Sequence, residues 1–137
     1  MVSSVYRHTQ IYYTKAFKEI GITTGQFMFI LCIYDNPGIT QDFLSNELDM
    51  NKSTVARVIW ELETEKYVKR IENKTDKRKY HIYLTKKGEA LYPKISKIVQ
   101  SYNENIVSHM SEEEITYLTK CLEKMRQNVV NISRGGV

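Results

Sequence analysis

The sequence predicts a mainly helical fold that carries one small β-hairpin. Apolar residues recur with the period of an α-helix along most of the chain, and only two prolines interrupt them. The period changes to that of a β-strand in one stretch, residues 67–84. With 137 residues, 42% of them hydrophobic, the chain is long enough to form its own core. We therefore expect a single domain over residues 1–137.

Two helices are predicted in the first part of the chain. The first covers about residues 2–20, where the apolar side chains form one broad stripe. The second begins at Thr24, a good N-cap residue, and ends before Pro37. Its residues 27–34 are hydrophobic nearly all round, which is typical of a buried central helix.

Two shorter helices follow, over about residues 41–48 and 52–65. Thr40 and Asn51 precede them, and their side-chain oxygens are suited to accept hydrogen bonds from the free N–H groups of the first turn. Two short helices joined by a turn of three or four residues form a helix-turn-helix.

The predicted hairpin consists of residues 67–72 and 79–84, joined by a polar turn over residues 73–78. Ile39 is a candidate for a further short strand.

Two long helices complete the predicted fold. Thr85 caps a helix that reaches about residue 109, and Pro93 predicts a kink or a slightly later start there. Ser111 begins a capping box for the last helix. Apolar residues of that helix are spaced three and four apart, like the seam of a coiled coil: Ile115, Leu118, Leu122, Met125, Val129 and Ile132.

Positive charge is concentrated in the middle of the chain. The whole chain carries a net charge of +4, but residues 51–88 hold eleven Lys or Arg against five acidic residues, a net charge of +6. Such a concentration attracts a polyanion because it releases condensed counterions. A solvated charged surface would have the same composition, so charge alone does not decide.

The fourth predicted helix has an outward face suited to read DNA. At 100° per residue, Val55 and Leu62 belong to the buried face. The opposite side carries Ser53, Thr54, Arg57, Trp60, Glu61 and Thr64. Hydroxyls and free N–H groups at a helix start bind phosphate oxygens, and Arg57 can pair with guanine O6 and N7. Lys52, at the side of this face, suits a phosphate contact, whereas an ordinary capped surface helix is the alternative.

The hairpin turn carries four cations, Lys74, Lys77, Arg78 and Lys79, with Asp76 among them. An arginine on a β-ribbon tip fits the negative potential of a narrow minor groove. We expect Asp76 to hold Arg78 by a charge-assisted hydrogen bond, to initiate the turn, or to do both.

Several stretches together resemble the MarR family of bacterial regulators. They are ITTGQF (22–27), TQDFLSNEL (40–48), DMNKSTVAR (49–57), LETEKYVKR (62–70), DKR (76–78) and IYLTKKG (82–88). The resemblance implies a winged helix-turn-helix DNA-binding lobe over residues 22–88. It further implies a helical dimerisation region over residues 1–20 and 89–133, with the seam of the last helix in the interface.

The resemblance also implies a function: a homodimeric transcriptional regulator, most simply a repressor, bound to a pseudopalindromic site in double-stranded DNA. Ser53, Thr54 and Arg57 would read the major groove and Arg78 the minor groove. The predicted DNA-binding set is completed by Thr40, Gln41, Lys52, Lys74, Asp76 and Lys77. Trp60 and Glu61 depart from the family, in which small or basic residues are common at these positions. Trp60 can pack on sugar-phosphate or on a neighbouring helix. Glu61 can accept a hydrogen bond from cytosine N4.

Many members of the family respond to a small amphipathic or phenolic effector. The candidate ligand-binding residues here are Tyr12, Tyr13, Phe17 and Met28. Aromatic residues at helical spacing are more often plain core, and that alternative stays open.

Other classes of protein are disfavoured. The chain has no glycine-rich phosphate loop, nucleophile elbow or Cys/His pair with metal-ligand spacing, so we expect no enzyme, cofactor or metal site. Its longest apolar run is too short for a bilayer, and Cys32 and Cys121 lie in apolar surroundings, which favours the reducing cytoplasm. Cys121, flanked by lysines, is the better candidate for redox chemistry but is expected to be inert. The main alternative function is a winged-helix interaction module that binds an acidic partner.

Overall fold

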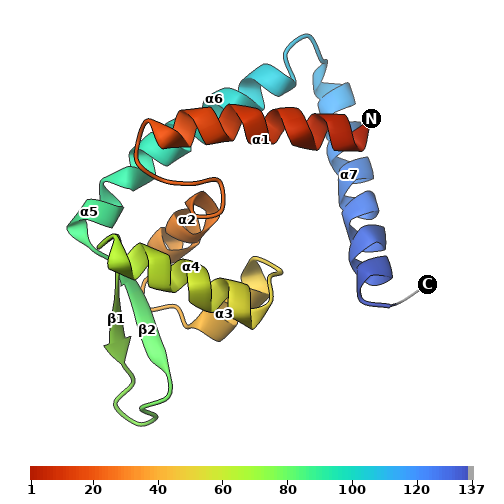
Figure 1. Cartoon of the computed structure of the whole chain (residues 1–137). Helices are drawn as coiled ribbons and strands as arrows, with labels where there is room; N and C mark the ends of the chain where they lie inside the picture. The colour runs from red at the N-terminus through yellow and green to blue at the C-terminus, as the bar shows by residue number, and fades with distance from the viewer. Residues whose placement is uncertain (136–137) are drawn as a thin grey trace. The chain divides into compact units, whose positions relative to one another are not determined.

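A computed structural model describes residues 1–135 and confirms the mainly helical fold with one antiparallel hairpin (Figure 1). In chain order the elements are α1 (Val2–Lys18), α2 (Phe27–Asp35), α3 (Gln41–Glu47), α4 (Lys52–Thr64), β1 (Val68–Glu72), β2 (Tyr80–Leu84), α5 (Lys86–Glu89), α6 (Leu91–Ile106) and α7 (Glu112–Ser133). The contacts divide the chain into two compact units, one of Met1–Val99 and one that begins at Gln100. The predicted winged lobe, residues 22–88, lies within the first unit.

The first unit has one apolar core, to which most of its elements contribute. Phe17, Ile30, Leu44, Ile59 and Ile82 are fully buried, and they come from α1, α2, α3, α4 and β2. The predicted buried face of α4 is confirmed, since Val55, Val58, Ile59 and Leu62 are all buried. The opposite face of α4 is therefore the one left for solvent or a partner.

Local capping fixes where three of the helices begin. The Thr40 hydroxyl accepts from Phe43 N–H, and the Asn51 side chain accepts from Thr54 N–H at 2.8 Å. Ser111 forms the predicted capping box with Glu114. Each such cap satisfies an N–H group that the helix leaves unpaired and contributes about 1 kcal/mol.

The start of α2 differs from the prediction. The helix begins at Phe27 rather than after Thr24, because Gln26 organises the preceding residues as a turn. The Gln26 side-chain oxygen accepts from Thr23 N–H at 3.1 Å, and Gln26 N–H donates to Thr23 O. A buried glutamine, rather than a threonine cap, sets the helix start.

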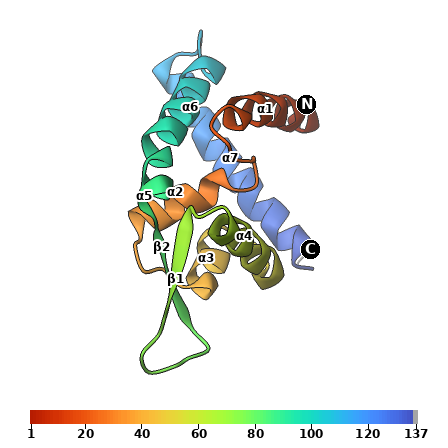
Figure 2. The same cartoon turned by 60° about the vertical axis from the view of Figure 1, so that its left-hand side comes forward.

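The hairpin forms the wing of the lobe and projects beyond α3 and α4 (Figures 1 and 2). Val68 pairs with Leu84 at its base and Glu72 with Tyr80 near its tip. Ile39 pairs with Ile82, so the short strand predicted at Ile39 is present as a single bridge that ties the wing to the segment before α3.

The helix predicted over residues 85–109 is divided in two. Thr85 caps α5, as predicted, and α6 begins at Leu91 with Pro93 in its first turn. Proline is tolerated there because the N–H groups of a first turn have no partner within the helix. Pro93 thus marks a later start rather than a kink.

The second unit contains α7, in which no residue is buried. Its seam residues Leu118, Leu122 and Val129 are 37%, 50% and 58% exposed. No helix among residues 1–135 is long and apolar enough to cross a membrane.

Candidate nucleic-acid interface

The outward face of α4 presents Ser53, Arg57 and Trp60, all three of which are exposed. The face begins at the helix start, where Asn51 Oδ1 accepts from both Thr54 N–H and the Ser53 hydroxyl at 2.8 Å. The cap therefore orients the Ser53 hydroxyl, whose oxygen can still accept.

Arg57 points to solvent and forms an ion pair on its own helix. Its Nη1 lies 2.7 Å from Glu61 Oε1, and the two side chains are 62% and 31% exposed. The outward orientation of Arg57 is confirmed. Its pairing with Glu61 was missed, although the i,i+4 spacing of opposite charges was a signal for it.

Lys52 lies at the side of the face and is paired across to α3. Its Nζ is 3.5 Å from Asp42 Oδ1, and both side chains are largely exposed. An exposed pair of this kind contributes little to stability, so the Lys52 amine can exchange Asp42 for another anion at small cost.

The tip of the wing is ordered by its own side chains. Asn73 Oδ1 accepts from Thr75 N–H, the Thr75 hydroxyl and Asp76 N–H. Asp76 Oδ1 accepts from Arg78 N–H at 3.0 Å and from Arg78 Nε at 3.3 Å. The expected contact between Asp76 and Arg78 is therefore present, and Asp76 both shapes the turn and holds the arginine. The Arg78 side chain is 92% exposed.

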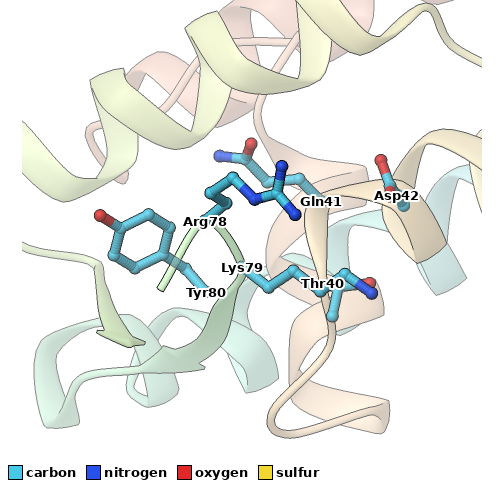
Figure 3. Close-up of a pocket in the computed structure, with 6 residues that line it drawn as sticks. All are labelled: Thr40, Gln41, Asp42, Arg78, Lys79 and Tyr80. Atoms are coloured by element: carbon cyan, nitrogen blue, oxygen red, sulfur yellow. The ribbon is translucent and has the colours of Figure 1, made fainter. Parts of the chain in front are cut away.

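A cleft of about 260 Å³ separates the wing from the start of α3. Figure 3 shows the residues that line it, which are Thr40, Gln41, Asp42, Arg78, Lys79 and Tyr80. The cleft brings together three predicted residues from distant parts of the chain, Thr40, Gln41 and Arg78. Asp42, which lines the cleft, also pairs with Lys52, so the start of α4 adjoins the cleft between the wing and α3. Lys79 was counted only as turn charge, and Tyr80 was missed.

Arg70 links the wing to the end of α4. Its Nε and Nη2 donate to the two carboxylate oxygens of Glu63 at 2.9 and 3.1 Å, and its guanidinium lies 4.9 Å from the centre of the Tyr80 ring. The hydrogen bond to Glu63 raises the pKa of Arg70 above its usual value. The ion pair with Glu63 joins β1 to the end of α4, and the contact with Tyr80 lies within the hairpin.

The comparisons with known proteins agree with this geometry. The MarR family model matches residues 22–80. A MarR transcriptional regulator from Methanosarcina mazei Go1 is 37% identical, with 96% of this chain and 94% of that one covered and a TM-score of 0.82. The chain belongs to the MarR family.

Two further relatives are described as transcriptional regulators. The HTH-type transcriptional regulator YybA of Bacillus subtilis (strain 168) is 28% identical over 82% of this chain and 75% of its own length. A MarR family regulator from Listeria monocytogenes, solved with a 26mer DNA, is 28% identical over 99% of this chain and 93% of that one, with a TM-score of 0.86. These MarR relatives are regulators, in agreement with the exclusion of an enzyme.

The residues predicted to bind an effector divide between the core and the surface. Tyr13 and Phe17 are buried and stack on each other at 5.1 Å, and Phe27 lies 4.7 Å from Phe17. Tyr12 and Met28 are 39% and 42% exposed. The core alternative thus describes Tyr13 and Phe17, and only Tyr12 and Met28 are open to a ligand.

The two cysteines differ in their surroundings. Cys32 is half-buried, and burial, together with the charges of Glu47 and Asp35, raises the pKa of its thiol. Cys121 is exposed on α7. Within residues 1–135, no group of three or more His, Cys, Asp or Glu side chains is placed to hold a metal ion.

Proposed function

We propose that this MarR-family chain is a sequence-specific, DNA-binding transcriptional regulator of the cytoplasm that acts as a repressor. One observation carries the proposal: Arg57 on α4 and Arg78 on the wing are both exposed, on a lobe whose contacts connect the two elements. An α-helix fits the major groove and a β-ribbon arginine fits a narrow minor groove, so one lobe can grip both sides of a phosphate strand.

The roles within the lobe follow from side-chain chemistry. In this proposal Arg57 reads guanine, and the start of α4, with Ser53 and Thr54, binds a phosphate. The positive charges of Lys52, Lys74 and Lys77 attract phosphates whatever the DNA sequence. The Listeria monocytogenes relative, solved with DNA, supports DNA binding by a lobe of this fold, since the match covers nearly the whole chain.

The DNA-bound species is a homodimer in this proposal. The α7 seam of Ile115, Leu118, Leu122, Met125 and Val129 is apolar and, apart from Ile115, exposed in the single chain. A second copy would cover this seam and would place two α4 helices on successive major grooves, roughly 34–36 Å apart or a multiple of that. The operator would then be a pseudopalindrome. A small amphipathic or phenolic effector that contacts Tyr12 and Met28 would release it by changing that spacing.

Selection of bound duplexes from a random pool tests the proposal, which requires an inverted repeat among the selected sequences. Arg57→Ala should then cost about 1–3 kcal/mol at one base pair and relax specificity there. Lys52→Ala should weaken binding to every sequence and reduce the salt slope by about 1. Weak binding to selected and scrambled duplexes alike would instead indicate a module for an acidic protein partner.

A further inference from the structure

We infer that Glu61 is a specificity-determining residue that acts through Arg57. Its carboxylate holds the Arg57 guanidinium and neutralises it toward phosphate, so that Arg57 strengthens binding only where a base edge offers two acceptors. This inference rests on the proposed DNA-binding function and assigns a role to a residue at which the chain departs from the family pattern.

The Glu61 carboxylate is fixed from both sides. Oε1 accepts from Arg57 Nη1 at 2.7 Å, and Oε2 faces Gln26 Nε2 at 3.5 Å. Gln26 is only 2% exposed and is itself held by Thr23 N–H, which donates to its side-chain oxygen. A second carboxylate, that of Glu65, also lies 3.5 Å from Gln26 Nε2. A buried amide therefore faces the acid that pairs with the arginine.

The geometry leaves Arg57 able to read a base. A guanidinium has five N–H donors, and the contact with Glu61 uses Nη1. Nη2 and Nε stay available for a guanine, whose O6 and N7 accept two hydrogen bonds side by side. Glu61 itself is half as exposed as Arg57, at 31% against 62%, so the arginine is the group nearer to an incoming duplex.

Electrostatics makes the pair selective. A lone arginine attracts every phosphate and strengthens binding to all sequences alike. With Glu61 attached, the pair is neutral, and the carboxylate repels a phosphate that approaches Arg57. This penalty applies where Arg57 turns to a phosphate, as on a scrambled duplex, and not where Arg57 donates to a base edge. The pair therefore increases the ratio of the affinities for selected and scrambled duplexes.

Glu61→Gln tests the inference, because the amide has nearly the same shape without the charge. We expect the variant to bind a scrambled duplex more tightly, with a salt slope steeper by about 0.9 per protomer as Arg57 becomes free for one phosphate. The ratio of affinities for selected and scrambled duplexes should fall by about three- to tenfold, part of what a bidentate base contact supplies.

Glu65→Gln is the matched control. The substitution removes one negative charge, as Glu61→Gln does, from a side chain that also faces Gln26. Glu65, however, lies about two helical turns beyond Arg57 and does not pair with it. This control should leave the affinity ratio unchanged. If Glu61→Gln shifts both duplexes equally, as a general change of charge would, the inference is overturned.

The Arg57→Ala background separates the two ways in which Glu61 could act. If Glu61 works through Arg57, adding Glu61→Gln to Arg57→Ala changes the ratio no further. A further fall in the double variant would mean that Glu61 contacts a base itself, which overturns the inference. A wild-type protein that shows no preference for any selected duplex would instead refute the proposed function, so the two failures are distinguishable.

Discussion

Replacing Gly88 by alanine tests the contact between α5 and the chain that leads into the wing. A Cβ added at Gly88 would lie 2.1 Å from the carbonyl oxygen of Tyr67 and 3.3 Å from Leu84 Cδ2. The same Tyr67 oxygen accepts from Thr85 N–H at 3.0 Å, and the Thr85 hydroxyl lies 3.2 Å from it while donating to Lys66 O at 2.7 Å. The neighbour is backbone tied to Thr85, so it cannot move aside without straining these hydrogen bonds.

The magnitude follows from these contacts. Relief of the overlap requires a backbone shift of roughly 1 Å, and overpacking of this kind costs about 1–3 kcal/mol. Each Thr85 hydrogen bond that is lost adds about 0.5–1.5 kcal/mol. We expect Gly88→Ala to lower the free energy of unfolding by about 3 kcal/mol and Tm by about 10 °C.

Urea unfolding at a fixed protomer concentration measures the change, since the stability of the proposed dimer would depend on concentration. Gly25→Ala is the control. Neither glycine has a positive φ, and a Cβ at Gly25 would meet only the Thr23 hydroxyl at 3.7 Å, an ordinary contact. An unfolding midpoint for Gly88→Ala equal to that of Gly25→Ala would refute the reasoning from this close approach.

Two further predictions concern α7 and the thiols. Leu118→Asp combined with Leu122→Asp should yield a monomeric or poorly folded chain, which light scattering detects. The control Thr116→Asp, on the opposite face of α7, should leave the oligomeric state unchanged. An intact dimer in the double variant would place the interface elsewhere. In a Cys121→Ser variant, Cys32 should react with Ellman's reagent slowly at pH 8 and faster on unfolding, because burial raises the pKa of its thiol and keeps it protonated. Equal rates for folded and unfolded protein would contradict this protection.

The parts of the fold that depend on neighbouring residues could be predicted from the sequence. Thr40, Asn51 and Ser111 each cap the helix expected of them, since a cap joins residues only three positions apart. The alternation of the hairpin and the buried face of α4 are likewise periodic patterns.

The parts that depend on distant residues could not. Gln26 sets the start of α2 while it faces Glu61 and Glu65, which lie 35 and 39 positions away. The close approach of Gly88 to Tyr67 is equally non-local. No spacing rule connects such residues, because only the folded chain brings them together.

The candidate site shows the same division. The outward direction of Arg57 follows from helical periodicity, and the contact of Asp76 with Arg78 follows from their adjacency in a turn. The pairing of Glu61 with Arg57 is also predictable from their i,i+4 spacing, although the outward position of Glu61 suggests a base contact instead. The cleft lined by both Arg78 and Gln41 could not be predicted from the sequence, since the wing and α3 are far apart along the chain.

The bridge from Glu63 through Arg70 to Tyr80 has a mechanical consequence. The ion pair of Arg70 with Glu63 joins the hairpin to α4, so in the proposed complex a change in the direction of one element would shift the other. Loss of contact in one groove would then weaken contact in the other. New operator preferences in such a lobe would then arise by substitutions at the outward side chains of α4 and the wing, while the backbone of both elements keeps its direction.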